Sequence, residues 1–166
     1  MEILKQGTHV VQLIPAHAHS GSAGYVSAST PYISMKGYHG GIFVADMGSI
    51  TGAVTFKFRQ AKDTSGTSQK ALSIDGYYTD AAAVASSSIT NDTFVYTAYS
   101  SGSSSQATGT TNNTLYVFPF QAAQLDATNS FDCVGVAAAA ANAVFGVTAI
   151  LYPRYEGQVP TVTKTN

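Results

Sequence analysis

A short run of strictly alternating residues does most to limit how this chain can fold. Within residues 53–59, the apolar residues Val54, Phe56 and Phe58 alternate with polar ones. Successive side chains of a β-strand point to opposite faces, so this pattern predicts a strand with one buried and one solvated face. Other apolar runs predict further strands at residues 10–14, 42–45, 70–74, 93–99, 114–118, 131–136 and 144–152.

The segments between these runs are rich in residues that favour turns. Residues 46–52 predict a turn or hairpin connection. Pro15 should end the first strand or place it at a sheet edge, because proline cannot donate a hydrogen bond to a ladder. The Ser-, Gly- and Thr-rich residues 100–113 predict an exposed flexible loop, either a plain hairpin tip or a partner-contacting loop. Helix should be limited to a turn or two at residues 80–86 and 120–125.

About eight strands without a long helix predict an all-β, single-domain fold. We expect two antiparallel sheets packed as a sandwich or jelly roll, with a closed barrel as the less favoured alternative. The alanine run at 137–141 is consistent with a small-residue strand or a closely packed loop. Of the 166 residues, 1–152 should form the domain and 153–166 an extended C-terminal arm, since the latter holds two prolines and shows no periodicity.

Charged residues are unusually scarce. They make up 10% of the chain, with a net charge of -1, whereas an average soluble domain has about 25%. The surface must therefore be formed largely by small uncharged residues and tyrosine, which suits a surface that a neighbouring protein covers. Scattered lysines and arginines argue against direct nucleic-acid binding. With no signal peptide or membrane-spanning run visible, we expect synthesis in the cytoplasm and no membrane partner.

Few residues suggest catalysis or metal binding. His17 and His19 would share one face of a strand and could grip one metal ion, with His9 and His39 as further ligands. No acidic residue or cysteine lies near them in sequence, so surface or interface histidines are the favoured interpretation and no cofactor is expected. The many serines include no nucleophile elbow. Cys133 lies in an apolar run and should be a buried thiol.

Tyrosine is the more informative residue type. The chain has 10 tyrosines and no tryptophan. Tyrosine supplies a large rigid contact area and one hydroxyl, which is why it is enriched at interfaces, although it also stacks on sugars and lines cores. The predicted partner-contact residues are Tyr25, Tyr32, Tyr38, Tyr77, Tyr78, Tyr152 and Tyr155.

Several segments in the first half of the chain are similar to those of a known group of proteins. They are Val-Val-Gln-Leu-Ile-Pro-Ala at residues 10–16, Tyr-Val-Ser at 25–27, Met-Lys-Gly-Tyr at 35–38 and Ala-Val-Thr-Phe-Lys-Phe-Arg-Gln-Ala-Lys-Asp-Thr-Ser-Gly-Thr at 53–67, followed by Lys-Ala-Leu at 70–72. In these segments the chain resembles small virion proteins that tailed bacteriophages carry beside the major capsid protein.

The resemblance implies a non-enzymatic, capsid-associated role. We expect a decoration, cement or minor head protein on the head surface of a virion, with the major capsid protein as its partner. A homo-oligomer is expected, with a trimer favoured over a dimer, because linked contacts raise avidity by about 10²–10⁴. One alternative is a phage tail or host-recognition module that binds glycans through tyrosine-bearing loops. Another is a hydrolase on a β scaffold that uses His17 and His19.

Overall fold

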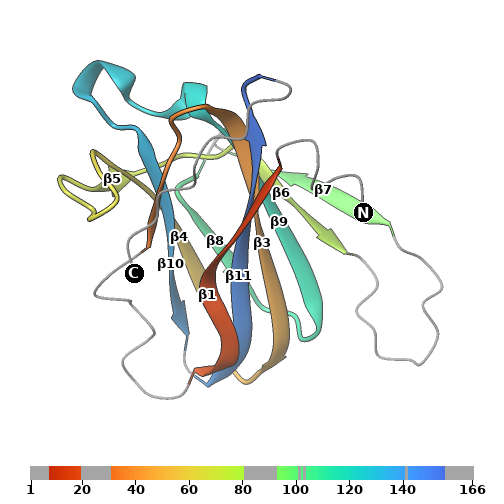
Figure 1. Cartoon of the computed structure of the whole chain (residues 1–166). Coiled ribbons are helices and arrows are strands. Elements are labelled where there is room, and N and C mark those ends of the chain that lie inside the picture. Colours follow the sequence, from red (N-terminus) through yellow and green to blue (C-terminus); the bar gives the residue numbers. More distant parts are fainter. Residues whose placement is uncertain are drawn as a thin grey trace.

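Two antiparallel sheets pack face to face in the computed structural model (Figure 1). The structure describes residues 8–19, 31–80, 93–100, 102, 104–140 and 142–155; at 17–19 and 140 it describes the backbone alone. In this part of the chain the helical elements are two short 3-10 turns, η2 (Ala122–Gln124) and η3 (Ala127–Asn129). The predicted all-β, two-sheet fold with little helix is therefore confirmed. None of the described helices has the length and apolar character needed to cross a bilayer.

The larger sheet has six strands in the order β1-β11-β3-β9-β6-β7. Every pairing in it is antiparallel. In Figure 1 it runs from β1 in red to β7 in pale green, the rightmost of the coloured strands. Its strands are β1 (His9–His19), β3 (Tyr38–Ile50), β6 (Gly76–Asp80), β7 (Phe94–Ala98), β9 (Thr114–Gln121) and β11 (Ala143–Pro153).

The smaller sheet has five strands in the order β2-β10-β4-β5, with β8 also paired to β4. Its pairings are antiparallel as well. Its strands are β2 (Tyr32–Ser34), β4 (Val54–Ala61), β5 (Lys70–Ala71), β8 (Gln106–Gly109) and β10 (Cys133–Ala140).

Aromatic rings from both sheets fill the space between them. The Phe58 ring of the smaller sheet lies 4.9 Å from that of Phe118 and 6.0 Å from that of Phe43, both in the larger sheet. Phe43 also stacks on Phe120 at 4.3 Å. In β4, Val54, Phe56 and Phe58 are buried while the residues between them are partly exposed, which confirms the face assignment made from the alternation.

The first strand does not end at Pro15. β1 continues to His19, and its register against β11 shifts between Gln12 and Ile14 and again between Ile14 and His17. Pro15 therefore lies within an irregular part of a sheet-edge strand, where a missing backbone donor does not break a regular ladder. The expectation that proline places this strand at an edge is confirmed, whereas the strand end predicted there is wrong.

Two predicted connections contain strand instead. Residues 46–50 continue β3, and the following turn leads from the larger sheet to β4 of the smaller one, so the two strands do not form a hairpin. Within the predicted loop at 100–113, β8 pairs with β4 from Val54 to Lys57. The alanine run is resolved as strand, because β10 extends to Ala140 alongside β4.

The chain beyond β11 is described only as far as Tyr155. Pro153 still belongs to β11, and the backbone N–H of Arg154 donates to the Gly37 carbonyl at 2.8 Å. Of the helical turn predicted at 80–86, Asp80 is instead the last residue of β6, and residues 81–86, like the rest of the predicted C-terminal arm, lie outside the described residues. The turn predicted near 120–125 is present as η2.

Candidate docking face of the six-stranded sheet

Two uncharged rows of outward-facing side chains run across the strands of the six-stranded sheet, and one of them is wholly aliphatic. One row pairs Val10 with Ile150, Ile150 with Ile42, and Ile42 with Pro119. Paired residues of an antiparallel ladder share a face, so these four side chains are neighbours on the surface. Val10 is 56% exposed and the other three are partly exposed. The row therefore places aliphatic carbon against solvent over four strands.

A second row crosses all six strands. On the central strands of the sheet, this row pairs Thr148 with Val44 and Val44 with Val117. Its members are amide, hydroxyl, aliphatic and aromatic side chains, and none of them carries a charge. In strand order its members are Gln12, Thr148, Val44, Val117, Tyr78 and Tyr96.

Exposed aromatic residues gather at the β7 end of this face. The rings of Tyr78 and Tyr96 lie 4.9 Å apart, centroid to centroid. All five residues of β7 are exposed; on the outer face Phe94 is 44% and Tyr96 47% exposed, whereas Val95, also 47% exposed, points to the other side of the strand. Monomeric proteins seldom leave a contiguous apolar surface of this kind uncovered unless it binds something.

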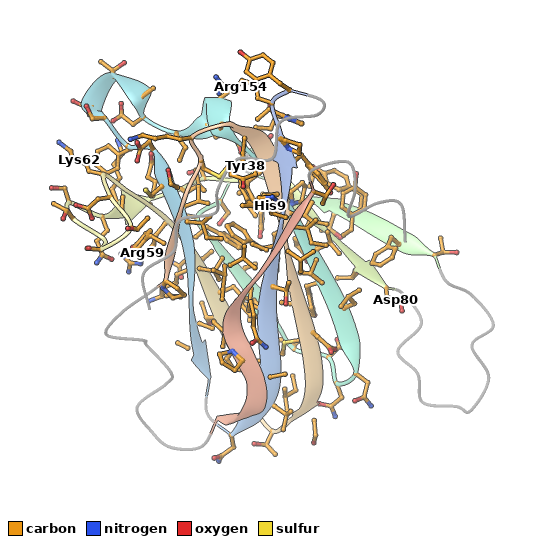
Figure 2. All side chains as sticks on the ribbon, in the orientation of Figure 1. His9, Tyr38, Arg59, Lys62, Asp80 and Arg154 are labelled. Atoms are coloured by element: carbon orange, nitrogen blue, oxygen red, sulfur yellow. The ribbon has the colours of Figure 1, made fainter. Side chains whose placement is uncertain are left out.

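A groove of about 620 Å³ lies at the end of the face near η2. The His39 ring stacks on that of Tyr152 at 6.0 Å, and Nδ1 of His39 lies 3.0 Å from the carbonyl oxygen of Pro153. Arg154 closes the same end, at the top of the molecule in Figure 2. The groove is lined by residues 39–42, 119–123, 152 and 154.

The outer face of the smaller sheet is different in character. Lys57 and Arg59 occupy outward positions on β4, opposite in direction to the buried phenylalanines. Figure 2 shows Arg59 and Lys62 on the left, on the side of the five-stranded sheet. On the six-stranded sheet, by contrast, Asp46 and Asp80 bring charge to the outer face toward the end away from the groove. The sandwich thus has one polar and one largely apolar outer face.

Two of the predicted partner-contact residues, Tyr32 and Tyr38, are buried inside the fold and are not at its surface. Each hydroxyl has an internal partner: Tyr32 donates to Oε1 of Gln69 at 3.1 Å, and Tyr38 lies 2.6 Å from Nδ1 of His9. Figure 2 shows His9 and Tyr38 side by side. Burial raises the pKa of both phenols above its ordinary value. A tyrosine whose hydroxyl is satisfied inside the fold can be buried at little cost, which the sequence did not reveal.

The other predicted tyrosines are divided among core, face and groove. The Tyr77 ring packs against the rings of Tyr99 and Phe118 on the core side of the sheet, whereas Tyr78 lies on the outer face. Tyr152 lines the groove, and Tyr155 is 62% exposed just beyond β11. Tyr25 lies outside the described residues.

The histidine pair is placed by its backbone alone. His17 pairs with Phe145 and His19 with Ala143, both on the edge strand β1, and their side chains are outside the description. His9 and His39, considered as further metal ligands, contact a tyrosine hydroxyl and a backbone carbonyl instead. Among the described side chains, no group of three histidine, cysteine, aspartate or glutamate residues is arranged to hold a metal ion.

Cys133 is a buried core thiol, as the sequence predicts. Its side chain is 1% exposed, and Sγ donates to Oδ1 of Asp132 at 3.1 Å. Burial, with a smaller contribution from Asp132, raises the pKa of the Cys133 thiol to about 12. The nucleophilic thiolate is therefore scarce near neutral pH.

Sequence reasoning missed the aliphatic members of the docking face and the exposed residues of β7. A signal was present in residues 42–45 and 114–120, where both sets of alternating positions are largely apolar. Such runs are typical of strands that are covered on both faces. One face of these strands is covered by the core, so the second apolar set lies on the outer surface of the sheet. No protein-family model, curated protein or solved structure matches the chain.

Proposed function

We propose that this chain is a non-enzymatic structural protein of a phage virion that binds the outside of the head shell and bridges capsid subunits. The observation that supports it best is the apolar outer face of the six-stranded sheet, centred on Val44 and Val117. A protein that works alone in water gains nothing from such a face, whereas a protein that is pressed against an assembly gains binding energy from it.

The composition of the face sets the character of the binding. Burial of apolar surface contributes roughly 25 cal/mol per Å², and it is nearly independent of ionic strength. Lys57 and Arg59 lie on the opposite sheet, away from the proposed contact. Binding to the shell should therefore change little between low and moderate salt, unlike the attachment of a basic protein to packaged DNA.

The proposal is tested by co-sedimentation of the purified protein with expanded heads of the same phage, prepared without it. The double variant Val44→Lys, Val117→Lys places two charges in the middle of the face, where both side chains are partly exposed, so folding should survive. We expect its affinity for heads to fall by about a hundredfold, since two charges must be desolvated.

The matched control adds a lysine to the opposite outer face. Thr55 is partly exposed on β4, at a position that points away from the core. The variant Thr55→Lys should bind heads at the wild-type stoichiometry. Equal loss of binding in both variants, or wild-type binding of the double variant, would overturn the proposal.

The groove favours glycan binding as the second candidate function. Stacked His39 and Tyr152 beside Arg154 offer an aromatic and hydrogen-bonding surface of the kind that sugars use. A glycan array and the variant Tyr152→Ala separate the two functions. A head-binding protein should ignore the array and keep its affinity for heads in this variant, whereas a glycan-binding module should bind sugars and lose them when Tyr152 is removed.

A further inference from the structure

The last strand of the larger sheet, β7, is an edge strand whose own residues lack the features that usually protect a sheet edge. In the described part of the chain it pairs with β6 alone, and it is the rightmost of the coloured strands in Figure 1. We propose that β7 pairs with β7 of a second copy of this chain, antiparallel about a two-fold axis. The two six-stranded sheets then join into one continuous sheet. This inference concerns the free protein and does not depend on binding to a capsid.

The backbone of β7 presents donors and acceptors to its open side. The N–H of Tyr99 donates to the carbonyl of Asp75 at 3.0 Å, which fixes this pair as a hydrogen-bonded one in the ladder. Hydrogen-bonded and non-hydrogen-bonded pairs alternate along an antiparallel ladder. The N–H and C=O groups of Phe94, Tyr96 and Ala98 therefore point away from β6. An edge of this kind is completed by another extended strand rather than by a helix or a small ligand.

The residues of β7 carry none of the features that keep sheet edges apart. Natural edges are protected by charged side chains, prolines or bulges. The sequence Phe-Val-Tyr-Thr-Ala has no charge and no proline, and its pairing with β6 is regular over all five residues. The opposite edge strand, β1, has Pro15 and two register shifts. Among the described residues, the sheet therefore carries protective features on one edge and leaves the other edge unpaired.

The difference between the regular edge strand β7 and the irregular edge strand β1 favours one symmetry for the assembly. A ring of three or more copies needs a head-to-tail contact between two different edges, and the irregular β1 is a poor partner for β7. A two-fold contact uses β7 twice. β7 can pair with an identical β7 because the strand has no charged residue, so no like charges meet between the two copies. The structure thus points to a dimer in place of the trimer favoured by the sequence.

The outward-pointing groups fix the register of the pair. When Tyr96 lies opposite its own copy, Phe94 lies opposite Ala98 of the partner, and every outward-pointing N–H and C=O group of the strand finds an acceptor or a donor. Tyr78 and Tyr96 of each copy, whose rings already contact each other, then meet the same pair across the axis. The uncharged rows of both copies become one continuous face.

The proposal is tested by sedimentation velocity on the whole chain, with variants that place a charge at the axis. Tyr96 is 47% exposed, so Tyr96→Lys and Tyr96→Glu should fold, and circular dichroism verifies that they do. Wild type should form a concentration-dependent dimer. In either variant alone, two like charges face each other across the axis and should weaken the dimer by about tenfold or more. An equimolar mixture of the two variants should restore it.

The control for the charge itself is Val10→Lys, which adds a lysine to the same face but on the opposite edge of the sheet. It should dimerise as wild type does. A wild-type chain that stays monomeric at high concentration, including one whose β7 accepts only a strand from another protein, would overturn the proposal. A dimer that is unaffected by charge at position 96, or one that the mixture fails to restore, would overturn it as well. Head binding by a monomer would leave the proposed function intact.

Discussion

The hydroxyl group of Tyr96 occupies the space directly above Gly76. A Cβ atom placed on Gly76 would lie 2.5 Å from that hydroxyl oxygen and 2.5 Å from the carbonyl oxygen of Thr97. The Tyr96 ring can lie along the sheet beside Tyr78 because the neighbouring position on β6 has no side chain. One glycine thus shapes the aromatic end of the docking face and brings β7 close to β6.

Replacement of this glycine should disturb β7 more than the rest of the fold. Gly76→Ala forces the alanine methyl group against phenol and against backbone that cannot easily move, so it should lower the free energy of unfolding by about 2–3 kcal/mol. Gly102 is the comparison: it has a φ of 84°, and a Cβ atom added there would meet no other atom within 4 Å, so Gly102→Ala costs only left-handed strain, about 1 kcal/mol. Urea unfolding followed by circular dichroism measures both. Equal losses would argue against the close contact.

Substitution of two adjacent residues of β9 should change the stability by very different amounts. Phe118 is buried between the sheets against Phe56 and Phe58, so Phe118→Ala should cost about 3–5 kcal/mol of unfolding free energy. Val117 faces outward, and Val117→Thr should stay within about 0.5 kcal/mol of wild type. Thermal or urea denaturation tests the pair. A large loss for Val117→Thr would show that its face is already covered within one chain.

The thiol of Cys133 should be inert in the folded protein. Because burial raises its pKa to about 12, the thiol stays protonated, and the side chain offers almost no exposed surface to a reagent. Iodoacetamide at mildly alkaline pH should leave the native chain unmodified, and it should label the chain rapidly in concentrated guanidinium. Mass spectrometry reads the result, and rapid labelling of the native chain would contradict the burial.

Stability should fall on acidification in part through Asp126. The Lys70 ammonium group, which pairs with this carboxylate, and then Asn129 lower the pKa of Asp126. A depressed folded-state pKa means that the ionised carboxylate stabilises the fold above its unfolded pKa of about 3.9, and that this contribution is lost as pH falls through the lower folded value. NMR titration of the Asp126 carboxyl should give a higher pKa in Lys70→Gln than in wild type. An unchanged pKa would show that the ion pair is absent in solution.

The sequence was most informative where one face of a strand is polar. In β4, lysine and arginine alternate with phenylalanine, so the buried and exposed sides were fixed by the residues alone. It was least informative for β8, whose residues Gln-Ala-Thr-Gly have little strand propensity. This segment is extended because it pairs with β4, a tertiary effect that no local pattern encodes.

The docking face was hidden from sequence analysis for a related reason. In Ile42-Phe43-Val44 every position is apolar, and only the packed structure shows that Phe43 points inward while its two neighbours point outward. The tyrosines show the converse. Tyr32 and Tyr38 were expected at an interface, but their hydroxyl partners Gln69 and His9 lie far away in sequence, so their burial could not be foreseen.

The most direct test of the docking face is an electron cryo-microscopy map of a phage head that carries the protein. The proposed function predicts that the outer face of the six-stranded sheet, marked by Val44 and Val117, lies against the major capsid protein. Lys57 and Arg59, on the other outer face, should then point to solvent. A map in which the Lys57 and Arg59 face contacts the shell, or in which the apolar face is bare to solvent, would contradict the account.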